Sequence, residues 1–182
     1  MKRDDRASTA VEFAAVGVPF FMVLVGILVV GLLSFSSSTL DYAVQKASRQ
    51  IMVGQTQSSS LTASQFQQSI LCPLLPAGLF DCSKIVVSLT SFAKANYDLN
   101  GGYADHYYEY LTSDKGGLKV PTAPSFCLGA GESYQVLQVT YPFPVLFSFL
   151  SGSPRIVDGK YIMMSSLTFK NEPFAAATSA GC

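Results

Sequence analysis

The sequence has little of the chemistry that enzyme centres and metal sites require. Only 13% of its 182 residues are charged, and His106 is the single histidine. No second imidazole or paired nucleophile accompanies His106, so a solvated or locally bonded loop residue is the simpler interpretation. The four cysteines contain no C-x-x-C pair, which disfavours a zinc site. The sequence therefore predicts no catalytic constellation, no metal and no cofactor.

An excess of charge of either sign is also missing. The chain has 12 basic and 12 acidic residues, and nine of each follow Ser36. A protein that binds nucleic acid usually carries a basic surplus, and strong electrostatic steering needs a surplus of one sign. The composition therefore gives no support to a nucleic-acid partner.

Between Ala14 and Phe35 the chain has no charged residue at all. These 22 residues form a helix of about 33 Å, which is enough to cross a bilayer core of roughly 30 Å. Lys2, Arg3 and Arg6 precede this run, and the next basic residue is Lys46. Because positive charge stays in the cytoplasm, we expect a single-pass protein of the inner membrane with its N-terminus inside and its C-terminal domain in the periplasm.

Proline is absent between Pro19 and Pro73, so a helix can continue beyond the apolar run. Small and apolar residues recur there at steps of three and four, the spacing of one helical face. They are Leu40, Ala43, Val44, Ala47, Ile51 and Gly54. The pattern predicts an amphipathic helix to about Gly54 or Ser58, with "GQTQSSS" as its frayed end. Pro19 removes one backbone donor inside the helix and is expected to kink it.

The remainder of the chain favours a sheet. "TASQFQQSIL" indicates a short helix with Thr62 as its N-cap. Three strands are predicted, "KIVVSLTS", "YQVLQVTY" and "YIMMSSLTFK", and the second is apolar on both faces, as a central strand is. No useful helical pattern separates them, so an antiparallel sheet is expected. Pro144 is expected to end or edge its strand because it cannot donate to a central ladder.

The N-terminal motif carries a resemblance to a known family. "RASTAVEF" followed by an apolar helix resembles the prepilin-peptidase signal of the type IV pilin superfamily, closest to its tight-adherence (Tad) branch. "ASRQIMVGQ", the C-x9-C pair, "VTYPFP" and "FKNEPF" look like TadE-type pseudopilins. The implied fold is α+β and pilin-like: a long N-terminal helix, membrane-spanning then amphipathic, packed on a small antiparallel sheet of three to four strands.

The resemblance implies cleavage between Ala7 and Ser8, although Ala7 stands where glycine is usual. Residues 1–7 would then be the leader peptide. The N-terminal helix would occupy residues 8–58, with its membrane span at about 14–35, and the extracytoplasmic domain residues 59–182.

Glu12 would become residue five of the processed chain, and the Glu12–Phe13 pair is expected to act in assembly. A charged acid costs about 2.5 to 3.5 kcal/mol at the centre of a membrane helix and less near the interface. Pairing with the free ammonium of a neighbour's first residue would offset that cost and set the stagger between subunits. The simpler alternative is a Glu at the membrane edge that faces headgroup water.

The expected function is structural. The chain resembles a minor pilin or pseudopilin that assembles or primes a Tad-type adhesive pilus and is processed by a prepilin peptidase. The resemblance implies as partners TadF-type and Flp-type pilins and the Tad secretion platform. Two alternatives stay open. The chain could be a membrane-tethered extracytoplasmic binding domain, or a secretory signal could be cut near "SFS", residues 34–36.

The cysteines favour disulfides, because an even number lies in a region assigned to an oxidising compartment. Four cysteines allow three pairings. The turn-rich "PLLPAGLFD" separates Cys72 from Cys82, so we expect these two to pair locally and Cys127 to pair with Cys182. The loop around His106 is rich in tyrosine, which suggests either an adhesive surface or packing onto the sheet.

Overall fold

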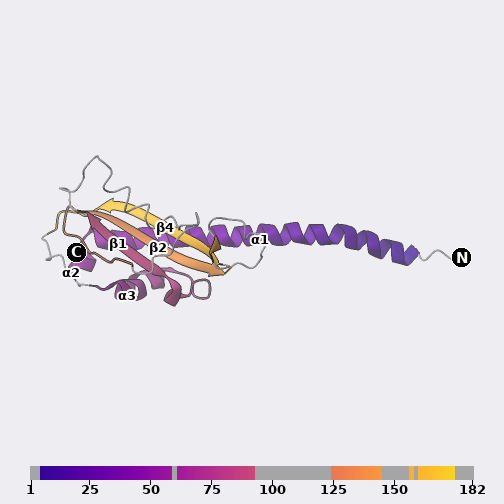
Figure 1. The fold of residues 1–182 in the computed structure, drawn as a ribbon, viewed down its shortest axis with the longest axis horizontal. Coiled ribbons are helices and arrows are strands. Elements are labelled where there is room, and N and C mark those ends of the chain that lie inside the picture. The colour runs from indigo at the N-terminus through magenta and orange to yellow at the C-terminus, as the bar shows by residue number, and fades with distance from the viewer. Residues whose placement is uncertain (1–4, 59–60, 93–123, 145–155, 158–159, 175–182) are drawn as a thin grey trace. The chain divides into compact units, whose positions relative to one another are not determined.

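The computed structural model describes residues 5–58, 61–92, 124–144, 156–157 and 160–174 (Figure 1). The chain divides into two compact units, Met1–Ser36 and Ser37–Cys182. Most of the predicted Tyr-rich loop, including His106, and Cys182 lie outside the described residues.

One helix, α1 (Asp5–Met52), opens the chain. It comprises 48 residues and includes Pro19 without a break in the helical assignment. The long N-terminal helix predicted from the sequence is therefore confirmed. The helix has two segments of different composition, the apolar segment of α1 (residues 10–35) and the amphipathic segment of α1 (residues 37–52).

The helix ends earlier than the sequence suggested. The amide of Gly54 donates to the carbonyl of Ile51 at 3.1 Å, and Gly54 has φ +81°, a left-handed conformation that ends helices. A separate short helix, α2 (Gln55–Ser58), follows. The expected frayed end therefore contains an ordered turn, in which Thr56 and Gln57 are buried.

In the described part of the chain, the sheet has three long strands and one short one. They are β1 (Val86–Phe92), β2 (Tyr134–Pro144), β3 (Ile156–Val157) and β4 (Lys160–Lys170), and the sheet order is β1-β2-β4-β3. Every pairing of these strands is antiparallel, and β2 lies between β1 and β4 (Figure 1). The three predicted strands and the antiparallel sheet are thus confirmed, and Pro144 is the last residue of β2, as expected.

The amphipathic segment of α1 packs on one face of this sheet (Figure 1). Leu40, Ala43, Val44, Ala47 and Ile51 are all buried, which confirms the helical face predicted from their spacing. The apolar side chains of one sheet face complete the core; Val87, Leu89, Leu137, Val139, Tyr141, Phe143, Met163 and Phe169 are buried and alternate along their strands.

A short helical connection joins α2 to the sheet. Helix α3 (Ala63–Phe66) begins with a capping box, in which the Gln65 amide donates to Thr62 Oγ1 and the Thr62 amide donates to Gln65 Oε1 at 2.9 Å. The predicted N-cap is therefore confirmed. The chain continues as a π-helical turn, η1 (Gln67–Leu71), and a 3-10 turn, η2 (Cys72–Leu74).

Candidate functional site

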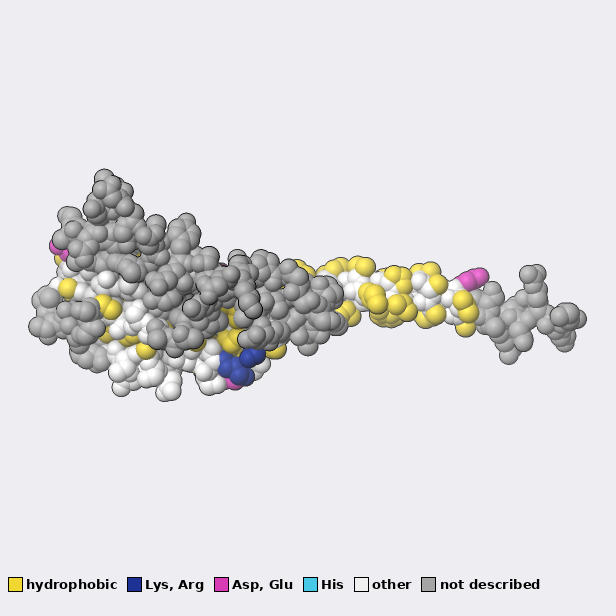
Figure 2. Space-filling view, viewed as in Figure 1, with side chains coloured by type: hydrophobic (Ala, Val, Ile, Leu, Met, Phe, Trp, Pro, Cys, Tyr) yellow, Lys and Arg dark blue, Asp and Glu magenta, His cyan; other side chains and the backbone are white. Residues whose placement is uncertain are grey.

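Most large hydrophobic side chains of the apolar segment of α1 are exposed, on all sides of the helix, while Val29 is buried. The exposed ones are Val11, Phe13, Val16, Val18, Phe20, Phe21, Met22, Val23, Leu24, Val25, Ile27, Leu28, Val30, Leu32 and Phe35. Figure 2 shows these side chains along the helix in yellow. A helix that is apolar all round belongs in a medium as apolar as itself. By length and composition, α1 is the one helix in the described part of the chain that could cross a membrane.

Glu12 is the only charged residue between Ala10 and Leu40, and its side chain is exposed on the helix surface. Phe13 is exposed as well, and its ring lies over Gly17 one turn further on, 3.7 Å from the position of a Cβ there. The predicted assembly pair thus lies at the start of the apolar segment of α1.

The predicted cleavage bond lies in the first turns of α1. The helix begins at Asp5, so the backbone of both Ala7 and Ser8 is helical; their side chains are outside the described residues. Helix ends fray, because their first amide groups have no partner within the helix. A peptide bond this close to the helix end can become accessible to a peptidase while the remainder of α1 stays helical.

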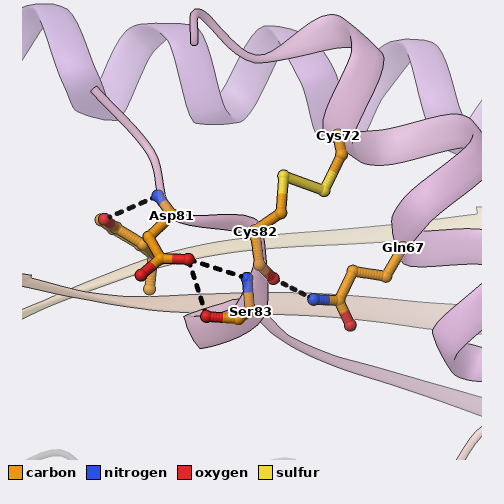
Figure 3. Close-up of a disulfide and its surroundings, with 6 residues drawn as sticks. Gln67, Cys72, Asp81, Cys82 and Ser83 are labelled. Carbon is orange, nitrogen blue, oxygen red and sulfur yellow. Dashed lines mark hydrogen bonds between the residues drawn. A yellow bond between two sulfur atoms is a disulfide. The ribbon is translucent and has the colours of Figure 1, made fainter. Parts of the chain in front are cut away.

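The predicted Cys72–Cys82 disulfide is present, with its Cα atoms 6.0 Å apart (Figure 3). It closes a loop of turns that ends in a short 3-10 helix, η3 (Cys82–Lys84). Gln67 Nε2 donates to the Cys82 carbonyl, which ties the loop to η1. The Asp81 amide donates to the Tyr141 hydroxyl at 3.1 Å, which ties the loop to β2.

Asp81 caps η3 and pairs with a base. Its Oδ1 accepts from the Ser83 amide at 3.1 Å, and its Oδ2 lies 2.7 Å from Lys84 Nζ. The hydrogen bond from Lys84, followed by those from Ser83, lowers the pKa of Asp81 from 3.8 to about 2. The Asp81 carboxylate likewise raises the pKa of Lys84. Both side chains are exposed, so this is a water-facing pair.

The second predicted disulfide stays a prediction, since Cys182, the expected partner of Cys127, lies outside the described residues. The described segments hold no group of three or more His, Cys, Asp or Glu side chains with the arrangement of a metal site.

Sequence reasoning missed a buried polar cluster beyond the end of α1. Gln57 Nε2 donates to the carbonyls of Ile51 at 3.2 Å and Gly129 at 3.4 Å. Asn171 Nδ2 donates to the Ala130 carbonyl at 3.0 Å. These contacts join segments that are distant in sequence, and buried polar groups need such partners. No local pattern marks them, because each partner comes from another part of the chain.

The motif "FKNEPF" has a role in the same place. The Glu172 amide donates to the Met52 carbonyl at 3.0 Å. The Phe174 ring lies against Gly54, 2.9 Å from the position that a Cβ would take, and the Phe174 backbone lies 2.6 Å from that of a Cβ on Gly131. This segment therefore clasps the end of α1 to the sheet. In the sequence, only the resemblance of "FKNEPF" to TadE-type pseudopilins marked this segment; its contacts could not be predicted from it.

In the comparison with known proteins, one region of the chain matches a known family. Residues 7–49 match the family model described as TadE-like protein. The matched region includes the predicted cleavage bond, the Glu12–Phe13 pair and most of α1. The searches of curated proteins and of solved structures found no match.

Proposed function

Since residues 7–49 of this chain are TadE-like, we propose that it acts as a minor pilin or pseudopilin in the assembly or priming of a Tad-type adhesive pilus. In this role a prepilin peptidase removes residues 1–7 and leaves Ser8 as the new N-terminus. The processed chain stays anchored in the inner membrane by α1 until it enters an assembly of pilins.

The observation that carries the proposal is that one continuous helix combines an exposed apolar segment with a segment that packs into the domain core. Its apolar segment has exposed hydrophobic side chains all round, whereas its amphipathic segment buries one face in the domain core. A helix with this division can leave the bilayer and enter a bundle of like helices without refolding the domain. A simple membrane tether does not require the acid at Glu12 or the leader cut.

Glu12 supplies the specific interaction in this proposal. In a bundle of apolar helices, its carboxylate pairs with the free ammonium of Ser8 on a neighbouring processed chain. An isolated charge in an apolar medium costs several kcal/mol, so the pair forms in preference to either charge alone. The pairing fixes the axial offset between two chains because the two groups lie four residues apart on α1.

The proposed partners follow from the TadE-like match and from the position of α1. They are the inner membrane, the prepilin peptidase, TadF-type and Flp-type pilins and the Tad secretion platform. The proposed orientation places the N-terminus in the cytoplasm and residues 37–182 in the periplasm, in agreement with the basic residues before the span.

The mature N-terminus tests the processing step. Intact-mass analysis of the membrane-extracted protein should give a chain that begins at Ser8. A start near residue 37 would indicate an ordinary secretory signal and overturn the proposal. An uncut chain would favour the membrane-tethered binding domain.

Substitution of Glu12 tests the assembly step. Glu12→Leu should leave insertion unchanged, because removing a charge from the span only lowers its transfer cost. Assembly should fall strongly, because a neighbour's ammonium then lacks its counter-ion. Glu12→Gln can still accept a hydrogen bond and should give a partial defect.

The measurement is the number of pili per cell and the recovery of the chain in sheared pili, at matched protein level. Val16→Leu is the control, since it alters an exposed apolar residue of the same segment without a change of charge. If Glu12→Leu assembles as well as the parent chain, Glu12 is only a boundary residue.

A further inference from the structure

The amphipathic segment of α1 carries a second line of side chains on the side away from its buried face. Tyr42, Lys46 and Arg49 are exposed, and Val53, just past the end of α1, continues the line. The Val53 amide donates to the Arg49 carbonyl at 3.2 Å, so the helical geometry extends to Val53. These residues, the outward seam of α1, follow one another at steps of four, three and four. At about 100° per residue they fall within roughly 60° around the helix axis.

The outward seam holds the large hydrophobic side chains that the domain leaves exposed. Among the described residues after Phe35, and with proline set aside, Tyr42 and Val53 are the only members of that class, with 54% and 46% of their surface exposed. Single exposed apolar residues on a surface need no explanation. Here both lie on one helical line, at the two ends of a pair of bases. That coincidence marks the seam as an interaction surface.

The two bases of the seam have no acidic partner in the described part of the chain. Neither Lys46 nor Arg49 takes part in the ion pairs of that part. Instead, Lys46 Nζ lies 5.8 Å from the centroid of the Tyr42 ring, a cation–π contact that holds the ring and the ammonium side by side. The seam therefore presents a tyrosine, two positive charges and a valine, and tyrosine and arginine are enriched at protein interfaces.

The spacing of the seam fits a second helix. Side chains that recur at steps of three and four form the line along which two helices pack. From Tyr42 to Val53 the seam runs for about 17 Å, or about three turns. A helix of that length can meet the two bases with carboxylates that lie three or four residues apart on one of its faces. It can meet Tyr42 and Val53 with apolar side chains.

We propose that the outward seam of α1 is the docking surface for an acidic helix of another protein. The partner places two carboxylates, three or four residues apart, against Lys46 and Arg49. Charge pairs of this kind select the partner and speed its association. Tyr42 and Val53 supply the contacts that exclude water at the two ends. The proposal does not rest on the proposed function, because the whole seam belongs to the unit formed by residues 37–182.

A lipid surface also attracts bases, but it fits the seam less well. A helix that lies in the membrane interface buries a broad apolar face there. In the amphipathic segment of α1 that face is already buried in the domain, with Ala43, Val44 and Ala47 at 0% exposure. Asp41, which is exposed next to Tyr42, would also be repelled by anionic headgroups.

A second copy of this chain is a poorer match than an acidic helix. Two copies that met through their seams would bring bases against bases, which disfavours the contact. The described acids after Ser36 are Asp41, Asp81, Glu132 and Glu172, and of these only Asp41 lies on a helix. The described part of the domain therefore offers no pair of carboxylates one helical turn apart.

Photo-cross-linking of the full-length chain in its own membrane tests the proposal. p-Benzoylphenylalanine is placed at Tyr42, at Val53 or, as the control, at Lys160, an exposed base at the start of β4. Irradiation should join positions 42 and 53, but not 160, to the same partner protein. Sequencing of the joined peptide by mass spectrometry should show two acidic residues three or four apart.

Charge changes test whether the bases hold the partner. Lys46→Glu combined with Arg49→Glu should lower the cross-linking yield at position 42 about fivefold, because like charges are then opposed. Lys160→Glu makes the same kind of charge change outside the seam and should have no effect. High salt should lower the yield of the chain without charge changes, because exposed charges are screened. That measurement needs no variant of the bases and therefore does not depend on their folding.

The outcomes that contradict the proposal are distinct. Cross-links to phospholipid or to a second copy of this chain would overturn it, as would a joined peptide without the two acids. Absence of a cross-link at positions 42 and 53, or a yield that neither the double charge reversal nor salt lowers, would overturn it as well. If the mature chain begins at Ser8 but no acidic helix is joined, the proposed function stands and the seam proposal is wrong.

Discussion

The two segments of α1 belong to one helix but face different surroundings. The amphipathic segment buries one side, with Ala43, Val44, Ala47 and Ile51 at 0% exposure. In the apolar segment, large side chains such as Phe13 and Ile27 expose 75% and 68% of their surface. Hydrophobic side chains before and after Ser36 therefore have different roles. In the domain it holds the fold together, whereas before Ser36 it makes the helix compatible with a bilayer or a bundle.

The same amino acid at two positions of α1 gives the strongest test of this contrast. Ile51→Ala should destabilise the domain by about 2 to 5 kcal/mol, because the side chain is fully buried and leaves a cavity. Ile27→Ala should leave domain stability unchanged. Denaturant unfolding of the full chain in detergent, followed by near-ultraviolet circular dichroism, measures both. Equal effects of the two changes would show that the segments unfold as one unit.

Loss of the Cys72–Cys82 disulfide should have the next largest effect on the stability of the domain. Cys72→Ser removes the bond that ties the loop before β1 to the end of η1 and should cost about 2 to 4 kcal/mol. Membrane insertion should be unaffected, because the bond lies wholly within the unit formed by residues 37–182. The same unfolding measurement tests stability, and alkaline extraction of membranes tests insertion. A Cys72→Ser chain as stable as the parent would mean that Gln67 and Tyr141 hold the loop unaided.

A pair of glycines gives a smaller effect and separates backbone strain from packing. Gly54 and Gly78 have φ of +81° and +93°, so alanine is strained at either position. Only Gly54 has a neighbour, the Phe174 ring, while nothing lies within 4 Å of a Cβ at Gly78. Gly78→Ala should cost about 1 kcal/mol from strain alone. Gly54→Ala should cost more, and the excess measures the steric clash of the added Cβ with the Phe174 ring. Equal costs would show that Phe174 yields freely.

Local periodicity predicted the parts of the fold that depend on local spacing. The buried face from Leu40 to Ile51 repeats at three and four residues, and the Thr62–Gln65 capping box is a four-residue pattern. The Cys72–Cys82 bond spans a short turn-rich loop. In each case the chain carries both partners close together, so one stretch of sequence is enough to identify them.

The features that sequence reasoning missed depend on contacts between distant segments. "GQTQSSS" has the composition of a frayed end, yet Gln57 is buried, and its side chain donates to a carbonyl 72 residues away. Asn171 likewise reaches carbonyls 41 and 42 residues away, at Ala130 and Gly129. Polar residues of this kind become core residues only when the fold supplies their partners. The assembly role of Glu12 depends on another chain and stays a prediction for the same reason.

The smallest expected effect comes from the ion pair that faces water. The pKa of Asp81 is lowered from 3.8 to about 2, so its charge stabilises the folded state above about pH 4 and this contribution is lost as the pH falls toward 2. Asp81→Asn keeps an acceptor for the Ser83 amide but removes the charge that Lys84 meets at 2.7 Å. At pH 7 the variant should therefore unfold at a slightly lower denaturant concentration than the parent. Near pH 2 the two unfolding midpoints should be the same.

Lys84→Gln removes the other charge of the pair. It should also lower the stability of the folded state at pH 7, and its difference from the parent should shrink as the pH falls from about 4 toward 2. Surface pairs are screened by salt, so high ionic strength should reduce both deficits at pH 7. The buried Ile51→Ala change should respond to neither pH nor salt in this way. A loss of stability in Asp81→Asn that persists at pH 2 would show that the charge of Asp81 does not account for its contribution to the folded state.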